Sequence, residues 1–180
     1  IFFKKLEDKK YPSKEKPYPI DYSISSNSRK FLYILCRITK PKNVIETGVA
    51  YGLSSFYILS ALNKNGFGEL ISIDSVFRPW QSEEMIGKII PKNLRERWKL
   101  VLGKSNEKLL ETFEKVEDTG IFIHDSLHSY KNMTFEFNCA IKKINNNGII
   151  ISDDILDNDA FNDFIKKNNF QNSIIRVEEK

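Results

Sequence analysis

The stretch NVIETGVAYGLSSFYILSAL, residues 43–62, decides the fold of this chain. Its first residues form a short apolar strand, and LSSFYILSAL, residues 53–62, predicts a helix. Between them, Gly48 and Gly52 allow the backbone to turn tightly and to approach a ligand closely. A strand, a glycine-containing turn and a helix are the repeating unit of an α/β protein.

Strands and helices alternate on both sides of this unit. The preceding stretch SSNSRKFLYILCRITKP predicts a helix that ends at Pro41. Downstream, strands are predicted at residues 69–75, 98–105, 120–126, 148–154 and 173–179, and helices at residues 82–90, 106–116, 130–144 and 158–168. The strands are continuous apolar runs, which is typical of strands buried on both faces. The sequence therefore predicts an α/β fold with a doubly wound, mostly parallel, Rossmann-like sheet.

Composition narrows the class of protein. The chain has 180 residues and a formal net charge of +4, and its basic residues are scattered, so nucleic acid is not the expected partner. No apolar run is long enough to span a membrane, so no membrane partner is expected either. Cys36 and Cys139 match no metal-ligand pattern, and as buried reduced thiols they indicate a cytoplasmic protein.

Two regions are predicted along the chain. Residues 1–25 contain three prolines and predict an extended arm with a short helix at its start. Residues 26–180 predict a single domain. The arm could close over a substrate, contact a second copy in a homodimer, or form a disordered tail.

Candidate ligand-binding residues follow the first two strands, because ligands of doubly wound sheets bind beyond the carboxyl ends of the strands. Glu46 stands where the dinucleotide fingerprint GxGxxG has a glycine, which disfavours a nicotinamide cofactor. Asp74 follows Gly48 at about the spacing of an acid that binds ribose hydroxyls. Together they favour an adenosine-type ligand. In the alternative, Glu46 caps backbone amides and Asp74 only starts a turn.

Three stretches carry a family resemblance. VIETGVAYGLSS followed by ISID is similar to the first two motifs of class I S-adenosylmethionine-dependent methyltransferases, and LVLGKSNEKLLE is similar to their third-strand segment. The resemblance covers about residues 26–175 and implies S-adenosylmethionine as the cofactor. The cofactor-binding residues that we predict on this basis are Glu46, Gly48, Tyr51, Gly52, Asp74, Ser105 and Asp125.

The resemblance also implies a seven-stranded sheet that ends in an antiparallel hairpin. The chain stops after SIIRVEEK, one strand short of that hairpin. Either the last strand of the hairpin is missing because the chain is truncated, or the strand at residues 173–179 pairs differently.

Acidic residues follow the fourth and fifth strands, in HDSLHSY and IIISDD. If these strands are neighbours, Asp125, Asp153 and Asp154 meet at one edge of the sheet, where three carboxylates suit a hard cation such as Mg²⁺. His128 would then be the catalytic base that removes a proton from a hydroxyl, as O-methylation requires. In the alternative, the acids cap helix starts and His128 is a surface residue.

The same segment carries a second resemblance. Asp-x-x-His-Ser-Tyr with a later Asp-Asp resembles the family that includes macrocin-type, metal-dependent sugar O-methyltransferases. That likeness implies metal binding by the three acids and a base role for His128. Methyltransferases that act on base amino groups usually have prolines after the fourth strand, and HDSLHSY has none.

The sequence thus predicts an S-adenosylmethionine-dependent enzyme that methylates a hydroxyl of a small molecule such as a sugar, with Mg²⁺ assistance. One alternative is an RNA methyltransferase that uses the lysine-rich surface, which steep salt dependence of RNA binding would reveal. The other is a non-catalytic binding or scaffold domain that keeps the fold.

Overall fold

The computed structural model describes residues 2–20 and 24–168. They form one five-stranded parallel sheet in the order β3-β2-β1-β4-β5. The strands are β1 (Asn43–Thr47), β2 (Glu69–Asp74), β3 (Trp98–Leu102), β4 (Thr119–His124) and β5 (Ile144–Ser152). The strand order reverses between β1 and β4, so the ligand site of such a sheet is expected at the carboxyl ends of these two strands.

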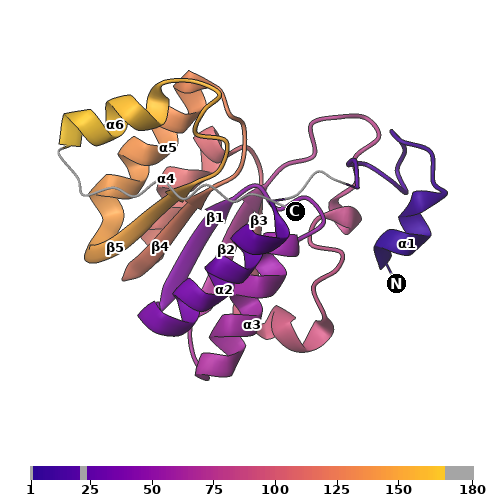
Figure 1. The fold of residues 1–180 in the computed structure, drawn as a ribbon, viewed down its shortest axis with the longest axis horizontal. Coiled ribbons are helices and arrows are strands. Elements are labelled where there is room, and N and C mark those ends of the chain that lie inside the picture. Colours follow the sequence, from indigo (N-terminus) through magenta and orange to yellow (C-terminus); the bar gives the residue numbers. More distant parts are fainter. Residues whose placement is uncertain (1, 21–23, 169–180) are drawn as a thin grey trace.

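Helices cover both faces of the sheet (Figure 1). On one face α2 (Ser26–Thr39) and α3 (Leu53–Asn65) pack against Val44 and Ile121, and on the other face α4 (Ser105–Lys115), α5 (Tyr130–Lys143) and α6 (Ala160–Asn168) pack against Ile45 and Phe122. Neighbouring residues of one strand therefore enter different cores, which explains why the strands are apolar without alternation. The predicted doubly wound α/β fold is confirmed.

The prediction of a helix at residues 82–90 is wrong. Instead of a helix, the structure has a short 3₁₀ helix, η1 (Glu83–Met85), followed by turns. Gly87 explains the difference, because it takes a φ of 63° and a Cβ at this position would overlap the indole of Trp98. Left-handed backbone and a closely packed ring are incompatible with a continuous helix. A second 3₁₀ helix, η2 (Lys92–Arg97), leads into β3.

The structure describes the predicted helix at the start of the chain but not the predicted last strand. The short helix expected at the start is α1 (Phe2–Glu7). The strand predicted at residues 173–179 lies outside the described residues, so the terminal hairpin stays a prediction.

Strand β5 begins at Ile144, four residues earlier than predicted, because an irregularity lets Ile144 pair with Thr119 ahead of the regular ladder. No helix among the described residues has the length and apolarity needed to cross a bilayer.

Candidate functional site

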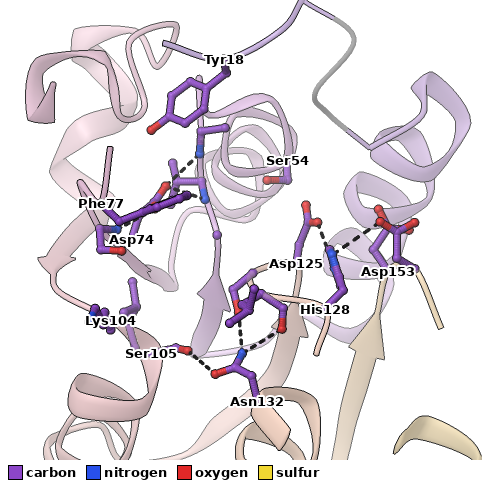
Figure 2. Close-up of a pocket in the computed structure, with 18 of the residues that line it drawn as sticks. Tyr18, Ser54, Asp74, Phe77, Lys104, Ser105, Asp125, His128, Asn132 and Asp153 are labelled. Atoms are coloured by element: carbon purple, nitrogen blue, oxygen red, sulfur yellow. Dashed lines mark hydrogen bonds and ion pairs between the residues drawn. The ribbon is translucent and has the colours of Figure 1, made fainter. Parts of the chain in front are cut away.

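A cleft of about 1670 Å³ lies at the carboxyl ends of the strands. Two loops meet there: the glycine loop (residues 48–52), which follows β1, and the acidic loop (residues 125–129), which follows β4. The segments after β2, β3 and β5 complete the walls, together with part of the arm. Figure 2 shows side chains from these segments around the cleft. The cleft is therefore at the position that the strand order predicts.

The glycine loop depends on its two glycines. Gly48 has a φ of 86°, and a Cβ there would overlap the backbone carbonyl oxygen of Asp125. Gly52 has a φ of 90°, and a Cβ there would lie 2.8 Å from the Cα of Gly87. Both conformations favour glycine. Gly48 thus brings the glycine loop against the acidic loop, whereas Gly52 brings it against Gly87, and Gly48, but not Gly52, is among the described residues that line the cleft.

Asp74 holds the glycine loop in place. Its Oδ2 accepts hydrogen bonds from the backbone amides of Val49 (3.0 Å) and Ala50 (2.9 Å), and its Oδ1 accepts one from Ser75 (2.6 Å). Figure 2 shows this carboxylate beside the loop. Burial raises the pKa of Asp74, and the three amides act against that rise. A carboxylate can accept about four hydrogen bonds, so Asp74 keeps capacity for a ligand hydroxyl in the cleft.

Glu46 lies beneath the glycine loop instead of in the cleft. Its side chain is 1% exposed, and its carboxylate accepts hydrogen bonds from the hydroxyls of Ser54 (3.3 Å), Ser55 and Ser72 (2.6 Å). Burial raises the pKa of Glu46 to about 7. Glu46 is not among the described residues that line the cleft, so in this structure it supports the start of α3 and does not face a ligand directly.

Tyr51 anchors the arm. Its hydroxyl donates to the backbone carbonyl of Tyr18 (2.9 Å) and accepts from the Tyr18 amide (3.3 Å). The rings of Phe2, Phe3 and Tyr18 pack edge-on against the Tyr51 ring. The arm therefore sits on the glycine loop, and its Tyr11 and Tyr18 line the cleft.

The far wall of the cleft follows β2 and β3. Ser105 begins α4, lines the cleft and donates from its Oγ to Oδ1 of Asn132 (3.3 Å). Lys104 and Trp80 line the same wall. The guanidinium of Arg78 lies 5.9 Å from the centre of the Trp80 ring, so a cation and an aromatic surface adjoin here.

The structure places all three predicted metal-binding acids along the cleft. Asp125, Asp153 and Asp154 line it, and we call them the acidic rim. Burial, and then the charge of Asp153, raise the pKa of Asp125 well above its usual value. Burial and the charge of Asp154 raise the pKa of Asp153. The acidic rim is thus a region of negative potential that a cationic ligand would stabilise.

Side-chain geometry groups the possible metal ligands differently from the prediction. In the described part of the chain, the set whose ligand atoms lie within 4.8 Å of one another is His128, Asp154 and Asp157. Asp154 is shared with the predicted set, whereas Asp157 was not predicted. The signal that could have identified it is its position three residues after Asp154, where a turn brings its amide to the Asp154 carbonyl (3.2 Å).

His128 lies between two acids. Its Nδ1 is 3.5 Å from Oδ2 of Asp154, and its Nε2 is 3.9 Å from Oδ1 of Asp125. Figure 2 shows the ring in this position between the acids. Both distances exceed the usual length of an N–H···O hydrogen bond. The structure thus brings the predicted base next to the acidic rim.

Comparison with known families now identifies the fold. Residues 45–155, more than half of the chain, match the model of a family described as a methyltransferase domain. The chain belongs to this methyltransferase family. The predicted class I S-adenosylmethionine-dependent methyltransferase fold is confirmed. A comparison with curated proteins found no match.

Several solved structures share the fold of this methyltransferase domain. It is similar to the O-methyltransferase TomG from Streptomyces achromogenes, in complex with SAM (19% identity, TM-score 0.64, 79% of this chain and 62% of that one). It is also similar to an O-methyltransferase from Bacillus cereus, in complex with SAH (21%, TM-score 0.61, 76% and 60%), and to the SAH-bound methyltransferase PaMTH1 from Podospora anserina (18%, TM-score 0.60, 79% and 59%). The chain thus spans about three fifths of the length of these structures.

The methyltransferase domain also contains a buried acid that was not predicted from the sequence. Glu136 of α5 is fully buried, and its Oε2 lies 2.7 Å from Nδ1 of His124, which is also fully buried. His124 is not among the described residues that line the cleft. A signal for Glu136 was present, because an acid beside Met133, Phe137 and Ala140 on the apolar face of a helix is anomalous unless it is paired.

Proposed function

We propose that this domain transfers a methyl group from S-adenosylmethionine to a hydroxyl of a small molecule. The observation that carries the proposal is the contact between the two loops. Because Gly48 packs directly on the backbone of Asp125, a cofactor on the glycine loop and an acceptor on the acidic loop would be neighbours. Positioning of this kind supplies much of the rate of a transfer reaction.

The cofactor would extend from Asp74 to the acidic rim. Asp74 retains capacity to accept from ribose hydroxyls, and Ser105, which follows the neighbouring strand β3, lines the same cleft. When bound, S-adenosylmethionine supplies a methyl group on a positively charged sulfonium. The acidic rim offers the negative potential that suits this charge, and Asp125 lies nearest to the glycine loop.

The acceptor would occupy the acidic side. The solved relatives from Bacillus cereus and Streptomyces achromogenes are described as O-methyltransferases, which supports a hydroxyl acceptor. A molecule with several hydroxyls, such as a sugar, suits a wall of acids beside Asn132 and Ser129. The nitrogens of His128 face carboxylates, so this residue could accept the hydroxyl proton only with Asp125 or Asp154 stabilising the imidazolium.

Residues suited to a divalent cation are present. Asp154 and Asp157 would hold it through carboxylate oxygens, because their ligand atoms are close enough to share one ion, and Asp125 and Asp153 adjoin them, so His128 remains available as the base. When bound, Mg²⁺ would lower the pKa of an acceptor hydroxyl. The same residues without an ion would still bind and orient a polyhydroxylated acceptor through their carboxylates.

A transfer assay tests the proposal. Protein treated with EDTA is incubated with methyl-labelled S-adenosylmethionine and a panel of sugars and phenols, with and without Mg²⁺. We expect label in at least one hydroxylated acceptor, more of it with Mg²⁺, and loss of that increase in Asp154→Asn. Label in RNA instead, with steep salt dependence, would replace this proposal by the RNA alternative. Cofactor binding without transfer to any acceptor would favour the scaffold alternative.

A further inference from the structure

Glu136 forms the centre of a polar network below the floor of the cleft. Its side chain is fully buried, and four side chains donate to its carboxylate. Oε2 accepts from Thr47 Oγ1 (2.6 Å) and from His124 Nδ1 (2.7 Å), and Oε1 accepts from Ser126 Oγ (2.7 Å) and Asn132 Nδ2 (2.9 Å). A buried carboxylate with this many donors is well compensated in its charged form. Burial raises the pKa of Glu136, but the hydrogen bonds, that of His124 first, outweigh this effect and lower it.

The network joins the elements that build both halves of the cleft. Thr47 ends β1 directly before the glycine loop, and Ser126 belongs to the acidic loop. Asn132 adds two more contacts: its Nδ2 donates to the carbonyl of Leu127 (3.1 Å), and its Oδ1 accepts from Ser105 (3.3 Å). Figure 2 shows Asn132 between Ser105 and the acidic loop. One carboxylate is thus connected to β1, β4, the acidic loop and, through Asn132, the start of α4.

The hydrogen bond with His124 also determines which ring nitrogen of His124 carries a hydrogen. An ionised carboxylate only accepts hydrogen bonds, so Nδ1 of His124 must carry the hydrogen. Nε2 of His124 is buried and has no hydrogen-bond partner among the described residues. The His124 ring meets the ring of His128 edge-on, with 5.1 Å between centroids and an interplanar angle of 89°. The orientation of His124 therefore limits where His128 can lie.

We infer that Glu136 is a positioning residue of the methyl-transfer site: it holds His124 as the Nδ1–H tautomer and, through Ser126 and Asn132, fixes the acidic loop that carries Asp125 and His128. This inference rests on the proposed function for its catalytic meaning, whereas its structural content concerns the loop alone. Glu136 does not line the cleft, so it acts only through these neighbours. The role is consequential because a displacement of about 1 Å in a transfer site can cost roughly 10²-fold in rate.

The chain offers a direct test because it contains two histidines. In untagged, ¹⁵N-labelled protein, long-range ¹H–¹⁵N spectra report the protonation state of each ring nitrogen, and His128→Asn assigns the His124 signals. We expect a single Nδ1–H tautomer of His124 in the unmodified protein. In Glu136→Gln, two of the four donors must face an amide NH₂, because each Glu136 oxygen accepts from two of them. We therefore expect the His124 tautomer to change and the His128 signals to shift.

Two further measurements separate this role from simple stabilisation. Glu111→Gln, on the exposed surface of α4 where Glu111 pairs with Lys115, is the control and should leave both histidine spectra unchanged. S-adenosylhomocysteine should still bind to Glu136→Gln, because Asp74 is not part of the network, and this binding would show that the variant is folded.

An Nε2–H tautomer of His124 in the unmodified protein would overturn the inference, and this result needs no folded variant. Histidine spectra that do not change in folded Glu136→Gln would overturn it as well. If the unmodified protein fails to bind S-adenosylhomocysteine, the proposed function fails instead, while the tautomer result stands independently.

Discussion

The two loops that meet in the cleft differ in how their polar groups are satisfied. In the glycine loop, the backbone amides of Val49 and Ala50 donate to the Asp74 carboxylate, and Glu46, beneath the loop, accepts from three serine hydroxyls. In the acidic loop and the segment after β5, burial, and then the charge of a neighbouring carboxylate, raise the pKa values of Asp125 and Asp153. The polar groups of the glycine loop therefore have partners within the protein, whereas a cationic ligand would stabilise the carboxylates of the acidic rim.

The largest expected effect concerns Glu46 under the glycine loop. Its pKa of about 7 exceeds the ordinary value of 4.5, so the free energy of unfolding should fall as pH rises from 4.5 to 7, by about 3 kcal/mol in total. Glu46→Gln should remove this decline and make the protein more stable than the unmodified chain at pH 8. Urea unfolding at pH 5 and pH 8 measures the difference, and parallel pH dependences of the two proteins would show that Glu46 ionises normally.

The next effect concerns the acceptor of the glycine-loop amides. Asp74→Ala leaves three backbone amides, two of them in the glycine loop, without their partner and should lower the free energy of unfolding by about 2 kcal/mol. Asp74→Asn keeps one acceptor oxygen and should lose less. Urea unfolding of both variants at one pH tests this order, and equal losses would mean that the charge, and not the two amide contacts, matters.

The third effect concerns the acidic rim, which a bound cation should stabilise. A ligand at about ten times its Kd adds about 1.4 kcal/mol to stability, so Mg²⁺ should raise the Tm of EDTA-treated protein by a few degrees. Asp154→Asn removes one member of the His128 cluster and should reduce this rise. Thermal scans with and without Mg²⁺ provide the measurement, and an equal rise in the variant would place the cation elsewhere.

The smallest effect concerns the arm. Tyr51→Phe removes the hydroxyl that both donates to and accepts from the backbone of Tyr18. The loss of about 1 kcal/mol should speed hydrogen exchange at the Tyr18 amide about fivefold, while the ring packing remains. Amide exchange by NMR would detect it. An unchanged rate would show that the aromatic contacts alone hold the arm.

The sequence predicted the sheet better than the direction of side chains. Strand ends follow from apolar runs, so Gly48, Asp74 and the acidic rim were found at the cleft. Whether a residue at a strand end faces the ligand or the core depends on the pleat and on its neighbours. For this reason Glu46 was expected at the ligand but lies beneath the loop.

Residues connected across the fold were not predictable from spacing. Glu136 is 89 residues from Thr47 and 12 from His124, and only the packing of α5 on β1 and β4 joins them. Similarly, the helix expected at residues 82–90 had suitable spacing, but the space that Trp98 needs beside Gly87 prevents it. Tertiary contacts thus overrode local preference at both places.

The measurement that tests the account most directly is calorimetric titration of the unmodified protein with S-adenosylhomocysteine. We expect binding with a Kd on the order of micromolar, weakened at least about tenfold in Asp74→Ala and unchanged in Glu111→Gln. Absence of binding to the folded protein, or equal binding in Asp74→Ala, would contradict the claim that the cleft between the two loops holds the methyl donor.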